Sequence, residues 1–173
     1  MDVKLQDPEQ ALHKRGKAEK VLEARAMHVW RESNMRMRIL IIEDDPAREE
    51  KLRSWLPVDM NAVISRSAGR AIGILKRDKG KVYAGIVLDH DLGKRPASES
   101  DLFLCGTDVV DAIIINVSRD VLILIHSVNE SQAPVMHTML QNAGFMVDRI
   151  PMDTLTRESF NEWLDYIREN YES

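Results

Sequence analysis

Five short apolar segments, each followed by a helical pattern, constrain the fold more than any other feature of this 173-residue chain. The segments are rich in Val, Ile and Leu and do not alternate with polar residues, which indicates strands that are buried on both faces. Such strands require helices on both sides of a parallel sheet. We expect the strands at 38–42, 62–64, 85–88, 121–125 and 145–147.

Helix start and stop signals separate these strands. Caps or first-turn prolines predict helices that begin near Asp45-Pro46, Ser67, Thr107, Pro134 and Thr156. Because crossovers between parallel strands are right-handed, few topologies remain, and the commonest is the flavodoxin-like order 2-1-3-4-5. We therefore predict an α/β fold with a five-stranded parallel sheet and helices on both faces. In this fold a crevice opens at the carboxyl ends of strands one and three.

The first 36 residues differ from the rest of the chain and predict a helical extension, with the main domain at 37–173. Asp7 is placed to cap a helix, Pro8 suits its first position, and Gln10 completes a capping box. The helix runs to about Trp30 with a ragged apolar stripe. That stripe packs against the domain, or it binds a protein partner or a second copy of the chain.

Composition excludes several classes of protein. The net charge is −4, which gives no global sign of binding to nucleic acid or membrane. No apolar run is long enough to span a bilayer, and the first ten residues lack the apolar core of a secretory signal. The single cysteine, Cys105, rules out an internal disulfide framework and a cysteine-rich zinc site. A cytoplasmic, reducing location is the default expectation.

Acidic residues follow two strands that meet at the predicted crevice. Glu43-Asp44-Asp45 ends the first strand, and Asp89-His90-Asp91 ends the third. Carboxylates that crowd together repel one another unless a cation or a proton compensates. Hard oxygen ligands of this kind suit Mg²⁺, Mn²⁺ or Ca²⁺. The alternative is that Asp44 and Asp45 only cap a helix, which accounts for one acidic residue but not for the whole set.

The segments 39–46 (ILIIEDDP) and 86–92 (IVLDHDL) resemble the receiver domain of two-component response regulators. The resemblance covers about residues 37–170. In that family, two acidic residues after strand one and an aspartate after strand three hold Mg²⁺. The strand-three aspartate also accepts a phosphoryl group from a histidine kinase.

The resemblance assigns roles to four acidic residues of this chain. It implies that Glu43 and Asp44 are the acidic pair that binds Mg²⁺ or Mn²⁺. It implies that Asp89 is the phosphoacceptor and a metal ligand, since Leu92 stands at the usual leucine three residues later. Asp91 matches the position that ligates the metal through its backbone carbonyl.

Three departures from the receiver pattern argue against an ordinary phosphorelay. Receivers place Thr or Ser after strand four, where this chain has His126 followed by Ser127. They also place Lys before Pro after strand five, to pair with phosphoryl oxygens. Here no lysine precedes Pro151, and Arg149, one residue out of register, is the nearest cation for a phosphate ligand. The loop after Asp89 is longer than usual.

The LDHDL motif at 88–92, together with His126, Ser127 and Asn129, resembles a divergent branch, the cyclic-phosphate processing receivers. This resemblance implies metal-assisted phosphoester chemistry with Asp89, His126 and Ser127 as catalytic residues. His126 would then serve as general acid or base. The alternative for His126 is a buried histidine that bonds a neighbour. His90 lies next to Asp89 on an extended segment, so its side chain can instead point into packing.

Two functions follow. The first is a signalling module that binds a divalent metal ion and a phosphate-bearing ligand or phosphodonor. The second is a metal-dependent phosphoesterase that acts on cyclic phosphates, and a nucleic acid enters only as a cyclic-phosphate end. A third interpretation takes Asp89-His90-Asp91 as the motif of haloacid-dehalogenase-type phosphatases. It ranks lower because that motif follows the first strand of the sheet, whereas here another strand precedes it.

Overall fold

A computed structural model describes residues 37–93 and 98–171 of the chain. Its sheet has five parallel strands in the order β2-β1-β3-β4-β5, so the predicted flavodoxin-like topology is confirmed. The strands are β1 (Met37–Ile42), β2 (Met60–Ser65), β3 (Gly85–Leu88), β4 (Leu122–Ile125) and β5 (Val147–Arg149). The helices are α2 (Pro46–Trp55), α3 (Ala68–Arg77), α4 (Gly106–Asn116), α5 (Ala133–Asn142) and α6 (Arg157–Tyr171), with a 3₁₀ helix η1 (Glu99–Phe103). The predicted helical extension at 1–36 lies outside the described residues.

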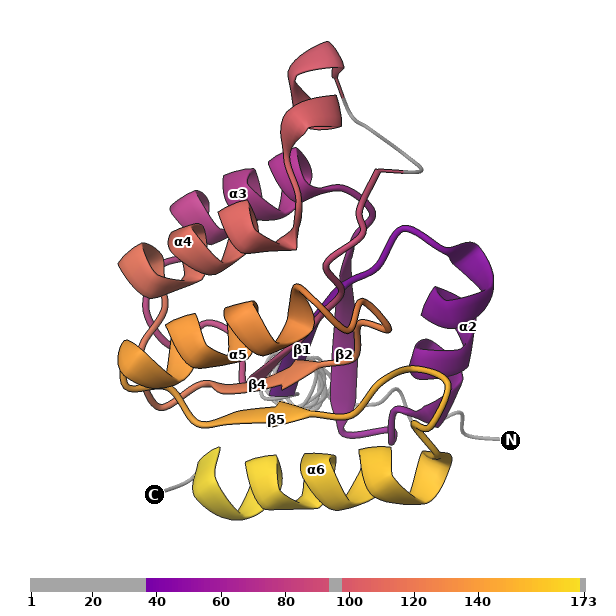
Figure 1. The fold of residues 1–173 in the computed structure, drawn as a ribbon. Coiled ribbons are helices and arrows are strands. Elements are labelled where there is room, and N and C mark those ends of the chain that lie inside the picture. Colours follow the sequence, from indigo (N-terminus) through magenta and orange to yellow (C-terminus); the bar gives the residue numbers. More distant parts are fainter. Residues whose placement is uncertain (1–36, 94–97, 172–173) are drawn as a thin grey trace, which may run out of the picture. The chain divides into compact units, whose positions relative to one another are not determined.

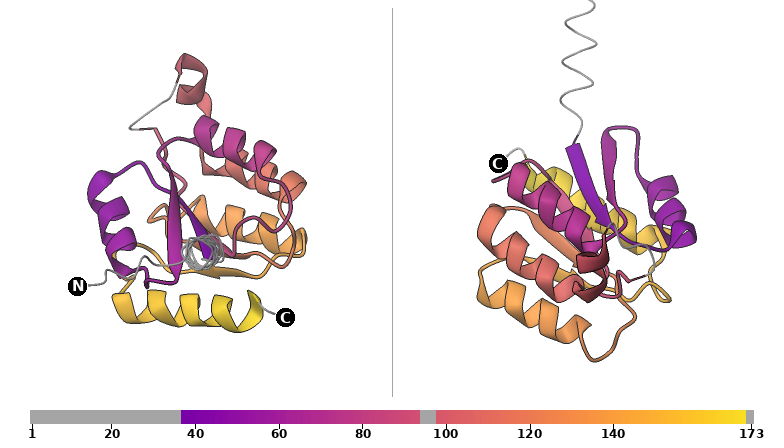
Figure 2. Two further views of the ribbon diagram at one scale, coloured as in Figure 1. Left: turned by 180° about the vertical axis from the view of Figure 1, so that it is seen from behind. Right: turned by 90° about the horizontal axis from the view of Figure 1, so that it is seen from above.

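Helices cover both faces of the sheet (Figure 1). Helices α3, α4 and α5 pack on one face and α2 and α6 on the other, and two further views show the same layers (Figure 2). Successive residues of a strand face opposite layers, so Leu40 contributes to the first core and Ile41 to the second. Strands β3 and β4 are therefore apolar at every position, and β1 is apolar from Ile39 to Ile42, as their sequence predicts.

The turn between β1 and α2 determines where the first acidic residues lie. The Asp45 carboxylate accepts hydrogen bonds from the backbone N–H groups of Ala47 and Arg48, and Pro46 occupies the first helical position. This is the predicted capping arrangement. It ends β1 abruptly and starts α2 within a few residues, which leaves Glu43 and Asp44 in the turn at the carboxyl end of the sheet.

Several element boundaries differ from the sequence prediction, and β2, at Met60–Ser65, is longer at both ends than the predicted 62–64. Two of the differences have a local cause. The fifth strand is Val147–Arg149 instead of 145–147, because the N–H of Phe145 still bonds to the carbonyl of Leu140 in the last turn of α5. Gly144, with φ at +90°, reverses the chain there. Helix α4 is capped at Cys105 instead of Thr107, because the Asp108 carboxylate accepts the Cys105 N–H at 2.8 Å.

The long loop after Asp89 contains η1. Figure 1 shows this short helix projecting beyond α3 and α4. The buried Asp101 carboxylate accepts a hydrogen bond from the N–H of Gly69 in the first turn of α3, which ties η1 to the domain. Leu102 and Phe103 are exposed beside it. Across the part of the chain that the structure describes, no helix combines the length and apolarity that a membrane span requires.

Gly85 and Gly73 form a matched pair for testing the packing of α6 on the sheet. A Cβ atom at Gly85 would lie 2.5 Å from Ile167 and 2.8 Å from Trp163, whereas one at Gly73 would meet nothing within 4 Å. We expect Gly85→Ala to lower the free energy of unfolding by about 2 kcal/mol through overpacking. Gly73→Ala should raise the free energy of unfolding by about 0.5–1 kcal/mol, because alanine stabilises a helix relative to glycine and Gly73 is exposed. Urea denaturation measures both, and equal effects of the two changes would contradict the packing described.

Candidate metal centre

The acidic residues of β1 and β3 meet because their strands are neighbours in register. Ile42 pairs with Leu88 at the ends of the two strands. The N–H of Asp89 bonds to the carbonyl of Ile42 at 3.0 Å, and the N–H of Glu43 bonds to that of Ser65 at 3.0 Å. The backbone therefore continues its sheet-like pairing for one residue beyond each strand. This places Glu43, Asp44 and Asp89 at one point of the carboxyl edge.

Glu43, Asp44 and Asp89 form a compact cluster that could hold a metal ion. One carboxylate oxygen from each lies within 4.8 Å of the others, and all three side chains are buried, with at most 1% of their surface exposed. Three oxygens at this spacing can surround one small divalent cation, which binds oxygen at about 2.0–2.1 Å in the case of Mg²⁺. The chemistry of the donor set thus fits Mg²⁺ or Mn²⁺.

The pKa of Glu43 is raised by its surroundings in this cluster. Burial raises its pKa to about 7, and the charges of Asp89 and Asp44 act in the same direction. A hydrogen bond from the Asp45 N–H to Glu43 Oε1, at 2.8 Å, and the charge of Arg48 oppose the rise. Glu43 Oε2 is buried and has no hydrogen-bond donor among residues 37–93 and 98–171. This oxygen therefore has no donor among the described residues to stabilise a negative charge.

Arg48 is the cation that faces the cluster. Its Nη2 atom lies 3.2 Å from Glu43 Oε1 and 3.2 Å from Asp89 Oδ2. The side chain reaches there from the first turn of α2 and keeps 22% of its surface exposed. Arg48 carries one positive charge and contacts two of the three carboxylates, those of Glu43 and Asp89. Sequence reasoning missed this residue, although its place four positions after Asp44, on the helix that leaves the acidic turn, was a usable signal.

His126 lies directly behind the acidic cluster. Its side chain is fully buried, and Nδ1 is 3.6 Å from Glu43 Oε2. Burial lowers its pKa to about 4 although the charge of Asp89 works against this, so the imidazole is neutral near pH 7. Neither ring nitrogen has a hydrogen-bond partner within the described ranges. The structure thus brings His126 to the cluster, as the position after β4 predicts, but on its buried side.

His90, Asp91 and Asn129 form a hydrogen-bonded group beside the cluster. His90 Nδ1 lies 2.7 Å from Asp91 Oδ1, and Asn129 Nδ2 lies 3.2 Å from the same oxygen. The bond with His90 is the main reason that the pKa of Asp91 is lowered. The Asp91 carboxylate is therefore directed to His90 and Asn129 and is not part of the three-carboxylate cluster. Sequence reasoning named all three residues but did not predict that they bond to one another.

Ser127 and Arg149 occupy different surroundings from those of the cluster. Ser127 is buried, and its Oγ accepts the N–H of Asn129 at 3.2 Å, which is a local turn contact. Arg149 pairs with Ile125 at the end of β5 and is exposed. No hydrogen bond or ion pair between described residues joins Arg149 to Asp89. The guanidinium that contacts Asp89 belongs to Arg48 instead.

Comparison with known families identifies the domain. Residues 38–142 match the family described as "Cyclic-phosphate processing Receiver domain". The chain belongs to this family. The receiver resemblance inferred from the acidic motifs is therefore confirmed, including its divergent branch. No curated protein matches the chain.

Solved structures of receiver domains share the fold. The response regulator domain of Thermotoga maritima CheB aligns with a TM-score of 0.53 at 17% identity, over 79% of this chain and 97% of that one. The BeF3-activated receiver domain of Klebsiella pneumoniae RstA gives 0.52 at 17% identity, over 76% and 98%. The receiver domain of a Pseudomonas aeruginosa sensor histidine kinase gives 0.52 at 16% identity, over 79% and 98%, and carries a magnesium ion in its active-site cleft.

Glu43→Gln tests the electrostatic description without any metal. In a chelating buffer, folded Glu43 keeps its proton up to about pH 7, whereas an unfolded glutamate loses it near 4.5. At this residue the folded state binds more protons in this window, so the contribution of Glu43 to the free energy of unfolding falls as pH rises from 4.5 to 7. His126, whose pKa is lowered to about 4, contributes in the opposite direction, so the comparison is made between variant and wild type. Glutamine carries no charge, so it avoids the cost of burying a charged carboxylate at this position. We expect Glu43→Gln to be more stable than wild type by about 2 kcal/mol at pH 8, with the difference shrinking toward pH 5.

The matched control is Glu50→Gln on the exposed surface of α2, where the side chain keeps 75% of its surface in solvent. Its stability relative to wild type should not change with pH over this window. Denaturant titrations at several pH values measure both differences. A Glu43→Gln difference that stays constant from pH 5 to pH 8 would show that Glu43 is not destabilised by its charge.

Proposed function

We propose that this receiver domain binds Mg²⁺ or Mn²⁺ through Glu43, Asp44 and Asp89 and binds or processes a phosphate group beside that ion, in a signalling or regulatory role. The observation that carries the proposal is the set of three buried carboxylates with oxygens within 4.8 Å. Carboxylates crowded in this way repel one another unless a cation or a proton compensates, and among the described residues Arg48 contacts Glu43 and Asp89. The solved Pseudomonas receiver with magnesium in its cleft supports the same site.

The three carboxylates would supply oxygen ligands, and the backbone carbonyl of Asp91 is a further candidate. The Asp91 side chain is engaged with His90 and Asn129, which fixes the segment after Asp89 without using a cluster oxygen. When bound, the ion offsets the charge of the carboxylates and of a phosphate group next to them. That compensation is what allows an anionic phosphate to approach an acidic pocket.

Asp89 is the residue beside which the phosphate group lies in this proposal. The N–H of His90 donates to Asp89 Oδ1 at 2.7 Å, which holds the carboxylate in place, and Arg48 lies 3.2 Å from the other oxygen. A guanidinium suits phosphate because its planar donors match the phosphate oxygens. Arg48 is thus placed to take the part that the resemblance gives to a lysine, while Arg149 lies at the exposed end of β5. A small-molecule or protein phosphodonor is the partner this role requires.

A metal-dependent phosphoesterase that acts on cyclic phosphates is the second candidate. It is favoured by the family to which residues 38–142 belong and by His126, whose neutral imidazole lies 3.6 Å from Glu43. A neutral imidazole can act as general base, and Ser127 follows it in the chain. However, His126 is fully buried, so a substrate reaches it only if neighbouring side chains move. Phosphate binding at Asp89 is the preferred proposal because Arg48, which lies 3.2 Å from Asp89, keeps 22% of its side chain exposed, whereas His126 has no exposed surface.

Phosphorylation of Asp89 separates the two functions. We expect wild-type protein incubated with acetyl phosphate and MgCl₂ to gain the mass of one phosphoryl group, because the Asp89 carboxylate can attack the phosphorus and release acetate. Asp89→Asn should gain none, and a chelator should prevent the reaction in wild type. Mass spectrometry of the intact protein measures the adduct.

A panel of 2′,3′-cyclic nucleotides and cyclic-phosphate-ended RNA provides the comparison. Turnover by wild type that is lost in His126→Ala, without any phosphoryl adduct on Asp89, would favour the phosphoesterase. If wild type gains no adduct and hydrolyses none of these substrates, the phosphoacceptor role of Asp89 and the phosphoesterase are both wrong.

A further inference from the structure

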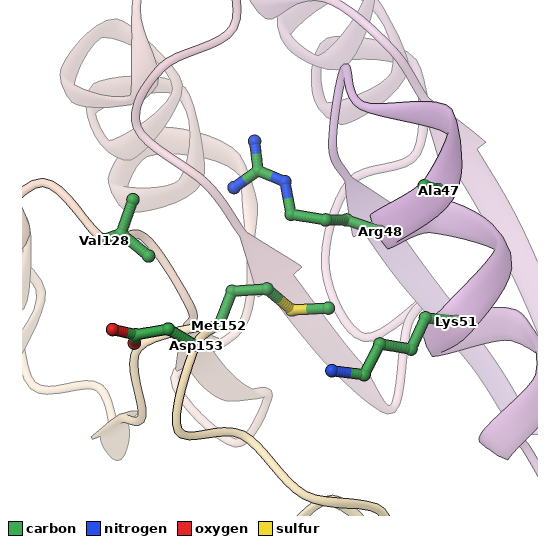
Figure 3. A pocket seen from close by; sticks show the side chains of 6 residues that line it. All are labelled: Ala47, Arg48, Lys51, Val128, Met152 and Asp153. Carbon is green, nitrogen blue, oxygen red and sulfur yellow. The ribbon is translucent and has the colours of Figure 1, made fainter.

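A cavity of about 360 Å³ lies beside the acidic cluster, between α2 and the loops that follow β4 and β5. Figure 3 shows Arg48 and Lys51 extending from α2 toward the residues on the opposite side. The lining residues are Ala47, Arg48, Lys51, Val128, Met152 and Asp153. All six belong to segments at the carboxyl edge of the sheet, the edge that also carries Asp89.

The cavity combines apolar walls with two cations, Arg48 and Lys51, on the α2 side and the Asp153 carboxylate on the opposite side. Val128 and Met152 supply apolar surface, and Val128 keeps 47% of its surface exposed. The Lys51 ammonium lies 4.9 Å from the centre of the Trp55 ring, so it stays at the edge on the α2 side. Arg48 is different, because it both lines the cavity and lies 3.2 Å from Asp89. It therefore joins the cavity to the acidic cluster.

We propose that this cavity binds the organic part of a phosphorylated small molecule whose phosphate group is held by Arg48 next to Asp89. The phosphate and the organic part of one ligand would then occupy adjoining sites. The inference rests on the proposed function for the phosphate and adds the class of ligand: an organic phosphate with a ring-sized apolar group, as distinct from inorganic phosphate.

Size and chemistry both support an organic ligand. The space is open to solvent on one side, and its volume of about 360 Å³ exceeds the roughly 150 Å³ of a buried cavity that accommodates benzene, so it has room for one ring. Val128 and Met152 gain nothing from inorganic phosphate, whereas they can cover an apolar ring and remove it from water. The single guanidinium at the cluster end favours a ligand with its phosphate at one end and its apolar part at the other.

Phenyl phosphate and orthophosphate are the probes, titrated calorimetrically into the full chain with saturating MgCl₂. We expect wild type to bind phenyl phosphate about tenfold more tightly than orthophosphate, because the ring is buried against apolar walls. Val128→Trp fills the cavity from an exposed position and should remove this preference while orthophosphate binding persists. Arg48→Gln should weaken the binding of both probes, because both place a phosphate at Arg48.

The matched control is Val58→Trp, since Val58 is 89% exposed and precedes β2 at the opposite edge of the sheet. It should leave both affinities unchanged. If wild type binds the two probes equally and Val128→Trp affects neither, the cavity inference is wrong while phosphate binding at the cluster stands. If phenyl phosphate still binds after chelation and in Asp89→Asn, but Val128→Trp abolishes it, the cavity is used without the proposed metal centre. Failure of both probes to bind overturns both proposals.

Discussion

Three carboxylates buried at one point of the sheet edge are the constraint around which this domain is arranged. Glu43 and Asp44 come from the turn after β1 and Asp89 from the turn after β3, and the parallel register of these strands forces them together. Crowding and burial raise the pKa of Glu43 to about 7. Charge repulsion therefore opposes the fold at this point, and the large apolar cores on both faces of the sheet must offset it.

The residues next to the cluster limit the negative charge at this point. Arg48 reaches back from α2 to Glu43 and Asp89, while His126 is held neutral on the buried side. The Asp91 carboxylate is engaged by His90 instead of adding a fourth charge. We propose that a divalent cation supplies further positive charge to the cluster. We also propose that Arg48, which lines the cavity and contacts Asp89, binds the phosphate group.

Much of this was predictable because it follows from local rules. Continuous apolar strands imply a doubly covered parallel sheet, and the strand order then places the residues after β1 and β3 side by side. The sequence did not predict contacts that depend on the direction of a side chain. Periodicity does not say that Arg48 turns toward the acidic turn, or that Asp91 turns toward His90. The fifth strand was misplaced because Phe145 is apolar like a strand residue, although its N–H completes the last turn of α5.

The most direct test of the central claim is calorimetric titration of Mg²⁺ or Mn²⁺ into the wild type, Asp89→Asn and Arg48→Gln. The last two variants remove opposite charges from one contact of 3.2 Å. The account predicts that wild type binds one ion, that Asp89→Asn binds it at least about tenfold more weakly, and that Arg48→Gln binds it more tightly because a competing cation is gone. Absence of binding in wild type, or equal affinities in all three proteins, would contradict it.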